Sequence, residues 1–234
     1  MKKIIAFLIV AFAIFSCSSK KEGNMIVKGQ IKGLKKGTLY LQKMKDTILV
    51  SVDSLTLMGN GNFLLTDNIT SPVVYYLTLD DKVTQKRIMF FGEKGEITIN
   101  DDLKKFGLHP EITGSENQKV YNNFLQLNKR FSNEYLDLIK KDLEAKRAKD
   151  QKLIQKLDID YQNLIRKRYL FTTQFALNNK NSQVAPYIAL TELTNANIKL
   201  LDTINNSLSN KVKNSLYGEK LQNFIDKIKA KKNR

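Results

Sequence analysis

The sequence predicts an α+β protein in which an antiparallel β-sandwich or barrel of about seven strands precedes an α-helical region. Two observations support this fold class. From residue 25 to about residue 100, short runs of β-branched and aromatic residues alternate with turn residues at intervals of about ten. After residue 113 the apolar residues recur at spacings of three and four, which is typical of helices. The expected domains are therefore a β-region at residues 25–112 and a helical region at residues 113–234.

The expected strands lie between clear turn residues. They are residues 26–31, 38–42, 48–57, 63–65, 73–79, 87–91 and 96–99. Gly29 interrupts the first of them and is interpreted as a β-bulge. The Gly- and Asn-rich run 59–62 predicts a turn, and residues 92–95 predict a hairpin-like turn. No βαβ pattern is present in the sequence, so a parallel nucleotide-binding sheet is not expected.

The helical region begins with Ser115 as an expected N-cap and Gln118 as its capping-box partner. The charged run 140–152 is interpreted as an exposed stretch or a bend between helices. Ser182 is expected to cap the next helix, and the basic end is expected to fray. An apolar stripe this long needs a partner surface, which another helix, the sheet or a second copy in a homodimer can supply. The stripe comprises Val120, Phe124, Leu127, Phe131, Tyr135, Leu138, Leu153, Leu157, Tyr161, Leu164, Arg168 and Phe171, and further helices are expected at 197–208 and 212–230.

Residues 1–16 are interpreted as a signal peptide. Lys2 and Lys3 form a positive start, and residues 4–15 form an apolar stretch. This stretch is too short to span a bilayer as a helix, but its length suits a secretion signal.

The run Ile14-Phe15-Ser16-Cys17 resembles the lipobox of bacterial lipoproteins. The resemblance implies cleavage between Ser16 and Cys17 and attachment of lipid to the Cys17 sulfur. Residues 17–24 are then a lipidated cysteine and a polar, flexible tether. The expected location is the outer membrane or surface of a diderm bacterium, facing the periplasm or the exterior, with membrane lipid bound through Cys17. The alternative is an ordinary signal peptide followed by an incidental cysteine.

The chain carries a formal net charge of +16, from 39 Lys and Arg against 23 Asp and Glu. Such a balance favours anionic surfaces in general. A nucleic-acid partner is not expected, because the chain is predicted to be exported, its lysines are dispersed, and lysine greatly outnumbers arginine, the better reader of bases. The simplest interpretation is a solvated, lysine-rich surface.

Short runs of turn, strand and capping residues follow one another in a recognisable order. They are 26–31 (Ile-Val-Lys-Gly-Gln-Ile), 52–54 (Val-Asp-Ser), 61–63 (Gly-Asn-Phe), 91–99 (Phe-Gly-Glu-Lys-Gly-Glu-Ile-Thr-Ile), 113–117 (Thr-Gly-Ser-Glu-Asn), 181–185 (Asn-Ser-Gln-Val-Ala) and 214–218 (Asn-Ser-Leu-Tyr-Gly). Together these runs resemble the uncharacterised N-terminal region of bacterial lipoproteins that carry a C-terminal thioredoxin-like (AhpC/TSA-type) thiol–disulfide oxidoreductase domain.

The resemblance implies an accessory region whose function is unassigned, and it does not carry the redox activity with it. In the family, the thioredoxin-like domain would begin shortly after the last helix, whereas this chain is expected to stop at Arg234 without one. Cys17 is the only cysteine, so no Cys-x-x-Cys pair is present for dithiol–disulfide exchange.

Few residues carry the pattern of a catalytic or metal site. His109 is the only histidine, and a metal site needs three or four ligands. Acidic pairs occur at Asp80-Asp81 and Asp101-Asp102. Paired carboxylates serve acid–base chemistry or calcium binding, but Asp is also an ordinary turn former where strands end. Neither a metal nor a cofactor is expected.

Aromatic residues supply the remaining candidates. Tyr75 and Tyr76 are adjacent on an expected strand, so one ring faces the core and the other the opposite face. One of them is therefore a candidate platform for a sugar or a peptide, with Asp80 and Asp81 nearby. The stripe of Phe124, Phe131 and Tyr135 is interpreted as core in preference to a partner groove.

These observations favour a non-catalytic binding or accessory module held on the cell envelope. An envelope protein or a glycan is the expected partner. One alternative is a chain that assists a separate thioredoxin-like oxidoreductase in trans. A second alternative is an envelope hydrolase or carbohydrate-binding protein that uses the aspartate pairs.

Overall fold

The computed structural model describes residues 23–80 and 87–232, and it confirms the α+β fold class. The strands are β1 (Met25–Lys32), β2 (Lys36–Lys45), β3 (Ile48–Met58), β4 (Asn62–Asp67), β5 (Val73–Leu79), β6 (Arg87–Gly92), β7 (Gly95–Asp102) and β8 (Glu111–Thr113). The helices are a 3-10 turn η1 (Leu103–Lys105), α2 (Glu116–Ala148), α3 (Gln151–Asn178), α4 (Val184–Glu192), α5 (Ile198–Ser207), α6 (Asn210–Lys213) and α7 (Leu216–Lys232).

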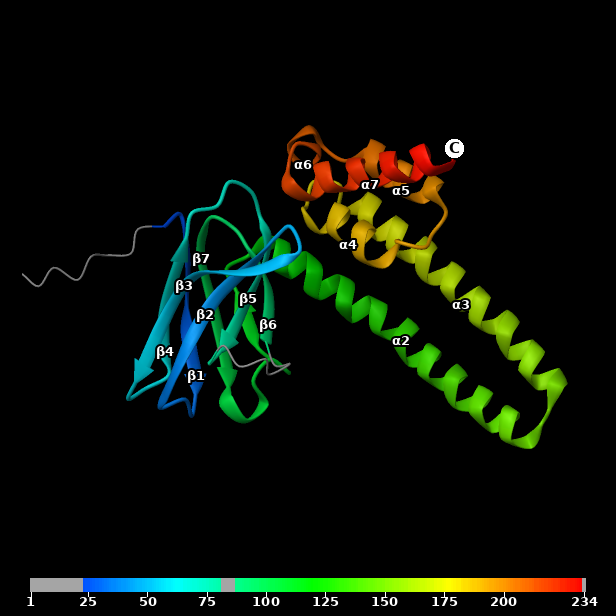
Figure 1. Ribbon diagram of the computed structural model, residues 1–234, viewed down its shortest axis with the longest axis horizontal. Coiled ribbons are helices and arrows are strands. Elements are labelled where there is room, and N and C mark those ends of the chain that lie inside the picture. Colours follow the sequence, from blue (N-terminus) through cyan, green and yellow to red (C-terminus); the bar gives the residue numbers. More distant parts are fainter. Residues whose placement is uncertain (1–22, 81–86, 233–234) are drawn as a thin grey trace, which may run out of the picture.

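The eight strands form two four-stranded sheets, in the orders β4-β1-β7-β8 and β3-β2-β5-β6 (Figure 1). Neighbouring strands run antiparallel with one exception, because β1 and β7 pair in parallel from Met25↔Gly95 to Lys32↔Asp102. The prediction of an entirely antiparallel sandwich was therefore wrong at this pair. Between β1 and β7 along the chain, β2, β3, β5 and β6 form the opposite sheet, and β4 returns to the first sheet beside β1. The chain therefore crosses to the facing sheet twice before β7 pairs with the other side of β1.

Both glycine-rich turns lie where the sequence predicted them, but they connect strands of different sheets. Residues 59–61 link β3 to β4, and residues 93–94 link β6 to β7. The hairpin interpretation of residues 92–95 was thus wrong. Turn residues mark where the chain reverses, but they do not specify whether the next strand pairs with the previous one or crosses to the facing sheet.

Gly29 is a point of close approach between strands, and the bulge interpretation was wrong. Gly29 stays in regular register with Phe63 on β4 and Ile99 on β7, at a φ of +152°. A Cβ atom at this position would lie 1.8 Å from the Ile99 carbonyl oxygen. The register shift in this part of the structure falls instead between Leu41 and Gln42 on β2.

Apolar side chains from the inner faces of both sheets form the core of the sandwich. Tyr75 and Phe90 are among its largest fully buried members, with ring centroids 5.9 Å apart. The other buried members are Met25, Val27, Ile31, Leu34, Leu39, Leu41, Leu57, Phe63, Leu65, Ile69, Leu77, Ile88, Ile97, Ile99 and Phe106.

Helices α2 and α3 form a long hairpin that extends from the sandwich (Figure 1). The bend predicted within residues 140–152 is confined to Lys149 and Asp150, because α2 continues as helix to Ala148. Lys149 adopts the left-handed conformation (φ +56°), and the Asp150 side chain accepts a hydrogen bond from the Leu153 N–H to begin α3.

The predicted apolar stripe packs mainly on itself across this hairpin. The ring centroids of Phe124 and Phe175 are 5.3 Å apart, as are those of Phe131 and Phe171, and those of Tyr135 and Tyr161 are 5.8 Å apart. These contacts set the antiparallel register of α2 and α3. The partner surface that the stripe required is thus supplied largely by the second half of the same stripe.

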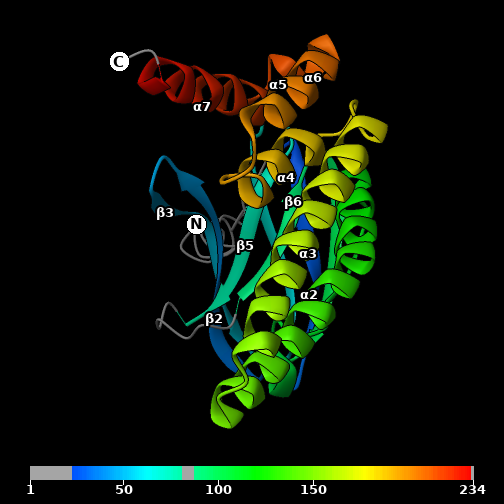
Figure 2. The same cartoon turned by 90° about the vertical axis from the view of Figure 1, so that its right-hand side faces the viewer.

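A second core forms where the base of the hairpin and α4 to α7 meet the outer face of β5 and β6. Seen from the helical side, α4 lies in front of β5 and β6, with α2 and α3 beside it and α5 to α7 above (Figure 2). Val74 and Phe91 reach this core from the sheet. The buried helical members are Phe124, Phe175, Ala176, Val184, Ala185, Ile188, Ala189, Leu193, Leu201, Ile204, Leu208, Val212, Leu221 and Ile225. Within residues 23–80 and 87–232, none of the helices is both long enough and apolar enough to span a bilayer.

Candidate functional site

Four of the sequence runs that define the family resemblance meet at one place, where the helices join the sheet. Asn117 at the start of α2 donates to Glu93 in the β6–β7 turn through both its backbone N–H (3.4 Å) and its side-chain amide (2.5 Å). The Asn117 side-chain oxygen accepts from the Ser182 hydroxyl (2.8 Å) and from the Gln183 N–H (3.0 Å) before α4. The Gln183 side chain in turn accepts from the Ser215 hydroxyl at 2.6 Å, just before α7.

Gln118 completes this polar connection, in a way that corrects the predicted capping box. Ser115 caps α2 as expected, since its hydroxyl accepts from the Gln118 N–H at 3.0 Å. The Gln118 side chain does not return to Ser115. Its oxygen accepts from the Phe91 N–H at 2.8 Å, and its amide donates to Asn122 at 2.7 Å. Gln118 therefore binds the helix to the edge strand β6.

Beside these polar contacts lies a cluster of aromatic rings. Phe91 is fully buried and makes edge contacts with Tyr121 (5.5 Å between centroids), Tyr187 (5.2 Å) and Tyr217 (6.5 Å). Burial raises the pKa of Tyr121 and Tyr187, and burial raises the pKa of Tyr217 to about 12. The Tyr217 hydroxyl accepts from the Val74 N–H at 2.9 Å. These phenols stay protonated at neutral pH.

We call this region the junction, and its chemistry is that of a structural connection. It comprises Phe91, Glu93, Asn117, Gln118, Tyr121, Ser182, Gln183, Tyr187, Ser215 and Tyr217. Hydrogen bonds pair its polar side chains with one another and with backbone groups, and its rings are packed against one another. A site with these properties fixes the helices on the sandwich and leaves little surface for a ligand.

The structure places the two candidate tyrosines on opposite faces of β5, as the alternation required. Tyr75 is fully buried in the sandwich core, and its hydroxyl donates to Asp67 at 2.5 Å. Tyr76 lies on the helical side, half-buried, with the Arg87 guanidinium 4.8 Å from its ring centroid. The ring of Tyr75 is therefore not available at the surface, and that of Tyr76 is partly covered.

Asp67 lies beside Tyr75 and binds Lys43 as well. The Lys43 ammonium contacts the Asp67 carboxylate at 2.5 Å and the Tyr75 hydroxyl at 3.3 Å. Burial by itself would raise the pKa of Asp67, but the hydrogen bonds from Lys43 and Tyr75 outweigh it and hold that pKa below its usual value. The group is a partly buried ion pair with a hydroxyl donor, and all three side chains are engaged with one another.

The candidate aspartates in the described residues hold turns. Asp80 has a positive φ of +58°, and its side chain accepts from the Thr38 N–H at 2.8 Å. Asp101 accepts from the N–H groups of Asp102 (2.8 Å) and Gly107 (2.7 Å), and Asp102 caps η1. The structure thus gives these carboxylates the turn-forming role that the sequence offered as the alternative to chemistry.

Several predicted positions lie elsewhere or outside the described residues. Ser16, Cys17 and Asp81 fall outside them. His109 is exposed in the segment between η1 and β8. In the part of the chain that the structure describes, no three His, Cys, Asp or Glu side chains gather as metal ligands would.

An open hollow lies on the hairpin, and we call it the hairpin cleft. It has a volume of about 360 Å³, which falls in the range of roughly 300–1,000 Å³ typical of ligand pockets. Its walls come from α2, α3 and the end of α4. They comprise Phe131, Tyr135, Tyr161, Leu164, Ile165, Arg168, Tyr169, Thr191 and Glu192.

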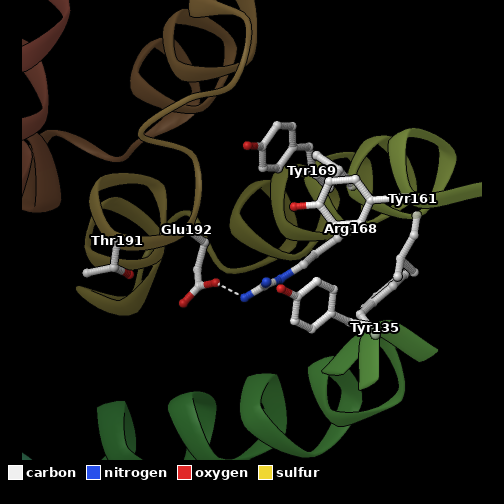
Figure 3. A pocket seen from close by; sticks show the side chains of 9 residues that line it. Tyr135, Tyr161, Arg168, Tyr169, Thr191 and Glu192 are labelled. Atoms are coloured by element: carbon white, nitrogen blue, oxygen red, sulfur yellow. Dashed lines mark hydrogen bonds and ion pairs between the residues drawn. The ribbon is translucent and has the colours of Figure 1, made fainter. Parts of the chain in front are cut away.

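An ion pair between α3 and α4 lies in this cleft. Figure 3 shows the Arg168 guanidinium reaching toward the Glu192 carboxylate, with the rings of Tyr135 and Tyr161 on either side of it in this view. The side chains of Arg168 and Glu192 are 39% and 23% exposed, so both are open to a ligand. The Arg168 Nε is buried and has no hydrogen-bond partner among the described residues. The pair therefore keeps unused hydrogen-bonding capacity.

A smaller hollow of about 230 Å³ continues from the cleft toward the tip of the hairpin. It shares Tyr135 and Tyr161 with the cleft and adds Leu138, Ile139 and Asp142 among its walls. A third hollow of about 330 Å³ lies between the sandwich and α7, where its lysines include Lys43, already paired with Asp67.

Sequence reasoning did not single out the cleft as a site. In the sequence, Arg168 falls in the apolar stripe between Leu164 and Phe171. A charged residue at a stripe position is a signal that this part of the stripe is not simply core. Glu192 gave no signal, because its pairing with Arg168 depends on how α4 packs against α3.

Comparison with known proteins supports the assignment of the first part of the chain to an uncharacterised domain. Residues 25–121 match a family model described as a domain of unknown function (DUF4369). The match covers the whole sandwich and the first turns of α2, including Asn117, Gln118 and Tyr121 of the junction. Neither the curated proteins nor the solved structures gave a significant match.

Proposed function

We propose that this chain is a lipid-anchored, non-catalytic binding module of the bacterial cell envelope and that it takes up its partner at the hairpin cleft. The observation that supports binding is the cleft itself, in which Arg168 and Glu192 retain exposed surface among aromatic walls. The observation that supports anchoring is the lipobox-like run ending at Cys17.

The contrast with the junction favours the cleft as the working surface. At the junction, the amides of Asn117, Gln118 and Gln183 are engaged in hydrogen bonds between elements. In the cleft, Tyr135 is 41% exposed, and the side chains of Arg168 and Glu192 are 39% and 23% exposed. A ligand gains free energy where it meets groups that the fold has not already satisfied.

A catalytic role has less support from the described side chains. The carboxylates that a hydrolase would use are already engaged: Asp101 and Asp102 accept from backbone N–H groups of their own turn, and Asp80 accepts from the Thr38 N–H on β2. Glu192 is paired with Arg168. We therefore propose binding without chemistry as the function.

The anchor is tested by replacing Cys17 with Ser. The wild-type chain is expected to incorporate radiolabelled palmitate and to enter the detergent phase on phase separation, because each buried methylene of a lipid contributes about 0.8 kcal/mol to membrane binding. The Cys17→Ser chain is expected to lose both properties, and Ser19→Ala is the matched control that retains them. Processed Cys17→Ser protein that stays in the membrane after washing at high salt would contradict the proposal.

Binding at the cleft is tested with a photo-crosslinking residue at position 135 in living cells. Position 159 on the outer face of α3, where Ile159 is 62% exposed, serves as the matched control. An envelope component attached at position 135 and not at position 159 is the expected result. Equal labelling at both positions, or none at position 135, argues against the cleft as the binding surface.

A second candidate function is assistance to a separate thioredoxin-like oxidoreductase in trans. The specific observation in its favour is the match of residues 25–121 to the uncharacterised domain, taken with the resemblance of the later runs to chains that carry such an oxidoreductase. Deletion of the chain is then expected to shift the redox state of envelope thiols. Unchanged thiols would remove this candidate.

A further inference from the structure

We infer that the hairpin cleft recognises an uncharged, hydroxyl-rich ligand of the saccharide class. This inference rests on the proposed binding function and names the ligand of the same site. Two features of the cleft carry it: the paired charges of Arg168 and Glu192, and the aromatic walls.

The paired charges favour a neutral ligand that both donates and accepts hydrogen bonds. An anion would have to compete with Glu192 for the guanidinium of Arg168, and a cation would have to compete with Arg168 for the carboxylate of Glu192. Hydroxyl groups avoid this competition, because one can donate to the Glu192 carboxylate while its neighbour accepts from the guanidinium. The hydroxyl of Thr191, beside Glu192 on α4, donates to the Tyr187 carbonyl oxygen at 3.1 Å and can still accept a hydrogen bond (Figure 3).

The aromatic walls favour a ligand with flat apolar faces and a polar edge. Tyr135, Tyr161 and Tyr169 line the cleft, and no hydrogen bond to their hydroxyls is found within residues 23–80 and 87–232. Tyrosine combines a large apolar ring with a polar tip at a low cost in side-chain entropy. The C–H faces of a sugar ring match such walls, and its hydroxyl edge matches the Arg168–Glu192 pair.

The placement of the cleft on helices disfavours an extended peptide. Peptides that bind as an added strand pair with free backbone groups at a sheet edge, whereas the backbone groups of α2 and α3 are used within the helices. An apolar helix docking in the cleft would cover the Arg168–Glu192 pair and remove it from water, which is unfavourable. A saccharide can replace the water around this pair with its own hydroxyls.

The inference is tested by calorimetric titration of the full lipidated chain, held in an amine-oxide detergent that has no sugar headgroup. The neutral probes are diacetylchitobiose, cellobiose and maltose, and the anionic comparison is digalacturonate. At least one neutral disaccharide is expected to bind saturably. Its affinity is expected to fall about tenfold or more in Arg168→Ala and in Tyr135→Ala, as loss of a charge-assisted hydrogen bond or a stacking wall requires.

Arg166→Ala is the matched control, since Arg166 is exposed two residues along α3 and thus points away from the Arg168 face. Its affinity is expected to change less than about twofold. Tyr135→Ala keeps the test decisive if Arg168→Ala fails to fold, because Tyr135 is 41% exposed. Tighter binding of digalacturonate, or unchanged binding in both cleft variants, would overturn the inference.

The outcomes also separate this inference from the proposed function. Absence of saturable binding by all three neutral probes, combined with specific crosslinking at position 135, overturns the saccharide class and leaves the binding module standing. If saccharide binding and specific crosslinking at position 135 are both absent, the saccharide inference and the proposed binding at the cleft are both overturned. Release of the chain by Cys17→Ser is independent of either result, since it reports on the anchor alone.

Discussion

The junction and the hairpin cleft lie on the same helices and use similar residues, yet they differ in how far the fold has satisfied them. In the junction, Asn117 and Gln118 each bridge α2 to another element, and Phe91 is enclosed by rings. In the cleft, the Arg168 guanidinium is paired with Glu192, and its Nε has no hydrogen-bond partner among the described residues. The comparison teaches that the recognisable sequence runs maintain architecture, whereas the open surface is built from residues without a recognisable motif.

The largest loss of stability is expected from Phe91→Ala in the junction. Removing a fully buried ring that contacts Tyr121, Tyr187 and Tyr217 leaves a cavity, and such changes lower the free energy of unfolding by about 3–5 kcal/mol. Urea unfolding followed by circular dichroism measures the change. Leu136→Ala on the exposed face of α2 is the control, expected to stay within about 0.5 kcal/mol. Equal effects of the two substitutions would refute the junction as the connection between the domains.

An intermediate effect is expected from Gln118→Met. Methionine has a similar length but cannot accept from the Phe91 N–H, which then remains buried without a partner. The expected loss is about 1–3 kcal/mol in the free energy of unfolding. Gln155→Met, at an exposed position of α3, is the matched substitution that should leave stability nearly unchanged. If Gln118→Met leaves the free energy of unfolding unchanged, the hydrogen bond from the Phe91 N–H to Gln118 does not hold α2 on β6.

The smallest effect on stability is expected from Tyr135→Ala in the cleft. The side chain is 41% exposed, and its ring contact with Tyr161 spans 5.8 Å between centroids, so the expected loss is about 1 kcal/mol or less. Thermal unfolding of Tyr135→Ala and Phe91→Ala under the same conditions compares the loss of stability in the cleft with that in the junction. A loss as large as that of Phe91→Ala would mean that the cleft, too, is primarily structural.

The sequence predicted local structure well and the assembly of the sheets poorly. The alternation of β5 and the Ser115 cap follow from residues close together in the chain, and both are present in the structure. The parallel pairing of β1 with β7 joins strands about 70 residues apart, and the turn after β6 crosses between sheets. These features depend on how the apolar faces of the two sheets pack against each other, and the spacing of apolar residues along the chain does not specify that packing.

The proposed binding surface was harder to predict for the same reason. The Tyr75 and Asp80 candidates were visible because adjacent residues stood out, and the structure gives both a role within the sandwich. The cleft draws Tyr135, Arg168 and Glu192 from three helices. In the sequence, Arg168 stands out as a charge in an apolar stripe, Tyr135 is interpreted as core, and Glu192 gives no signal. The three become neighbours only after α2, α3 and α4 have packed.

The position of β1 has a mechanical consequence for a chain tethered at its start. The described structure begins at Gly23, two residues before β1, and β1 is hydrogen-bonded to β4 on one side and to β7 on the other. Tension on a lipid anchor would therefore enter an inner strand of the sandwich and be shared between two ladders at once. Resistance to forced unfolding is set by the rate at which such ladders open. A tether at this end of the chain would therefore join a strand that is paired on both sides, whereas the hairpin of α2 and α3 extends from the sandwich (Figure 1).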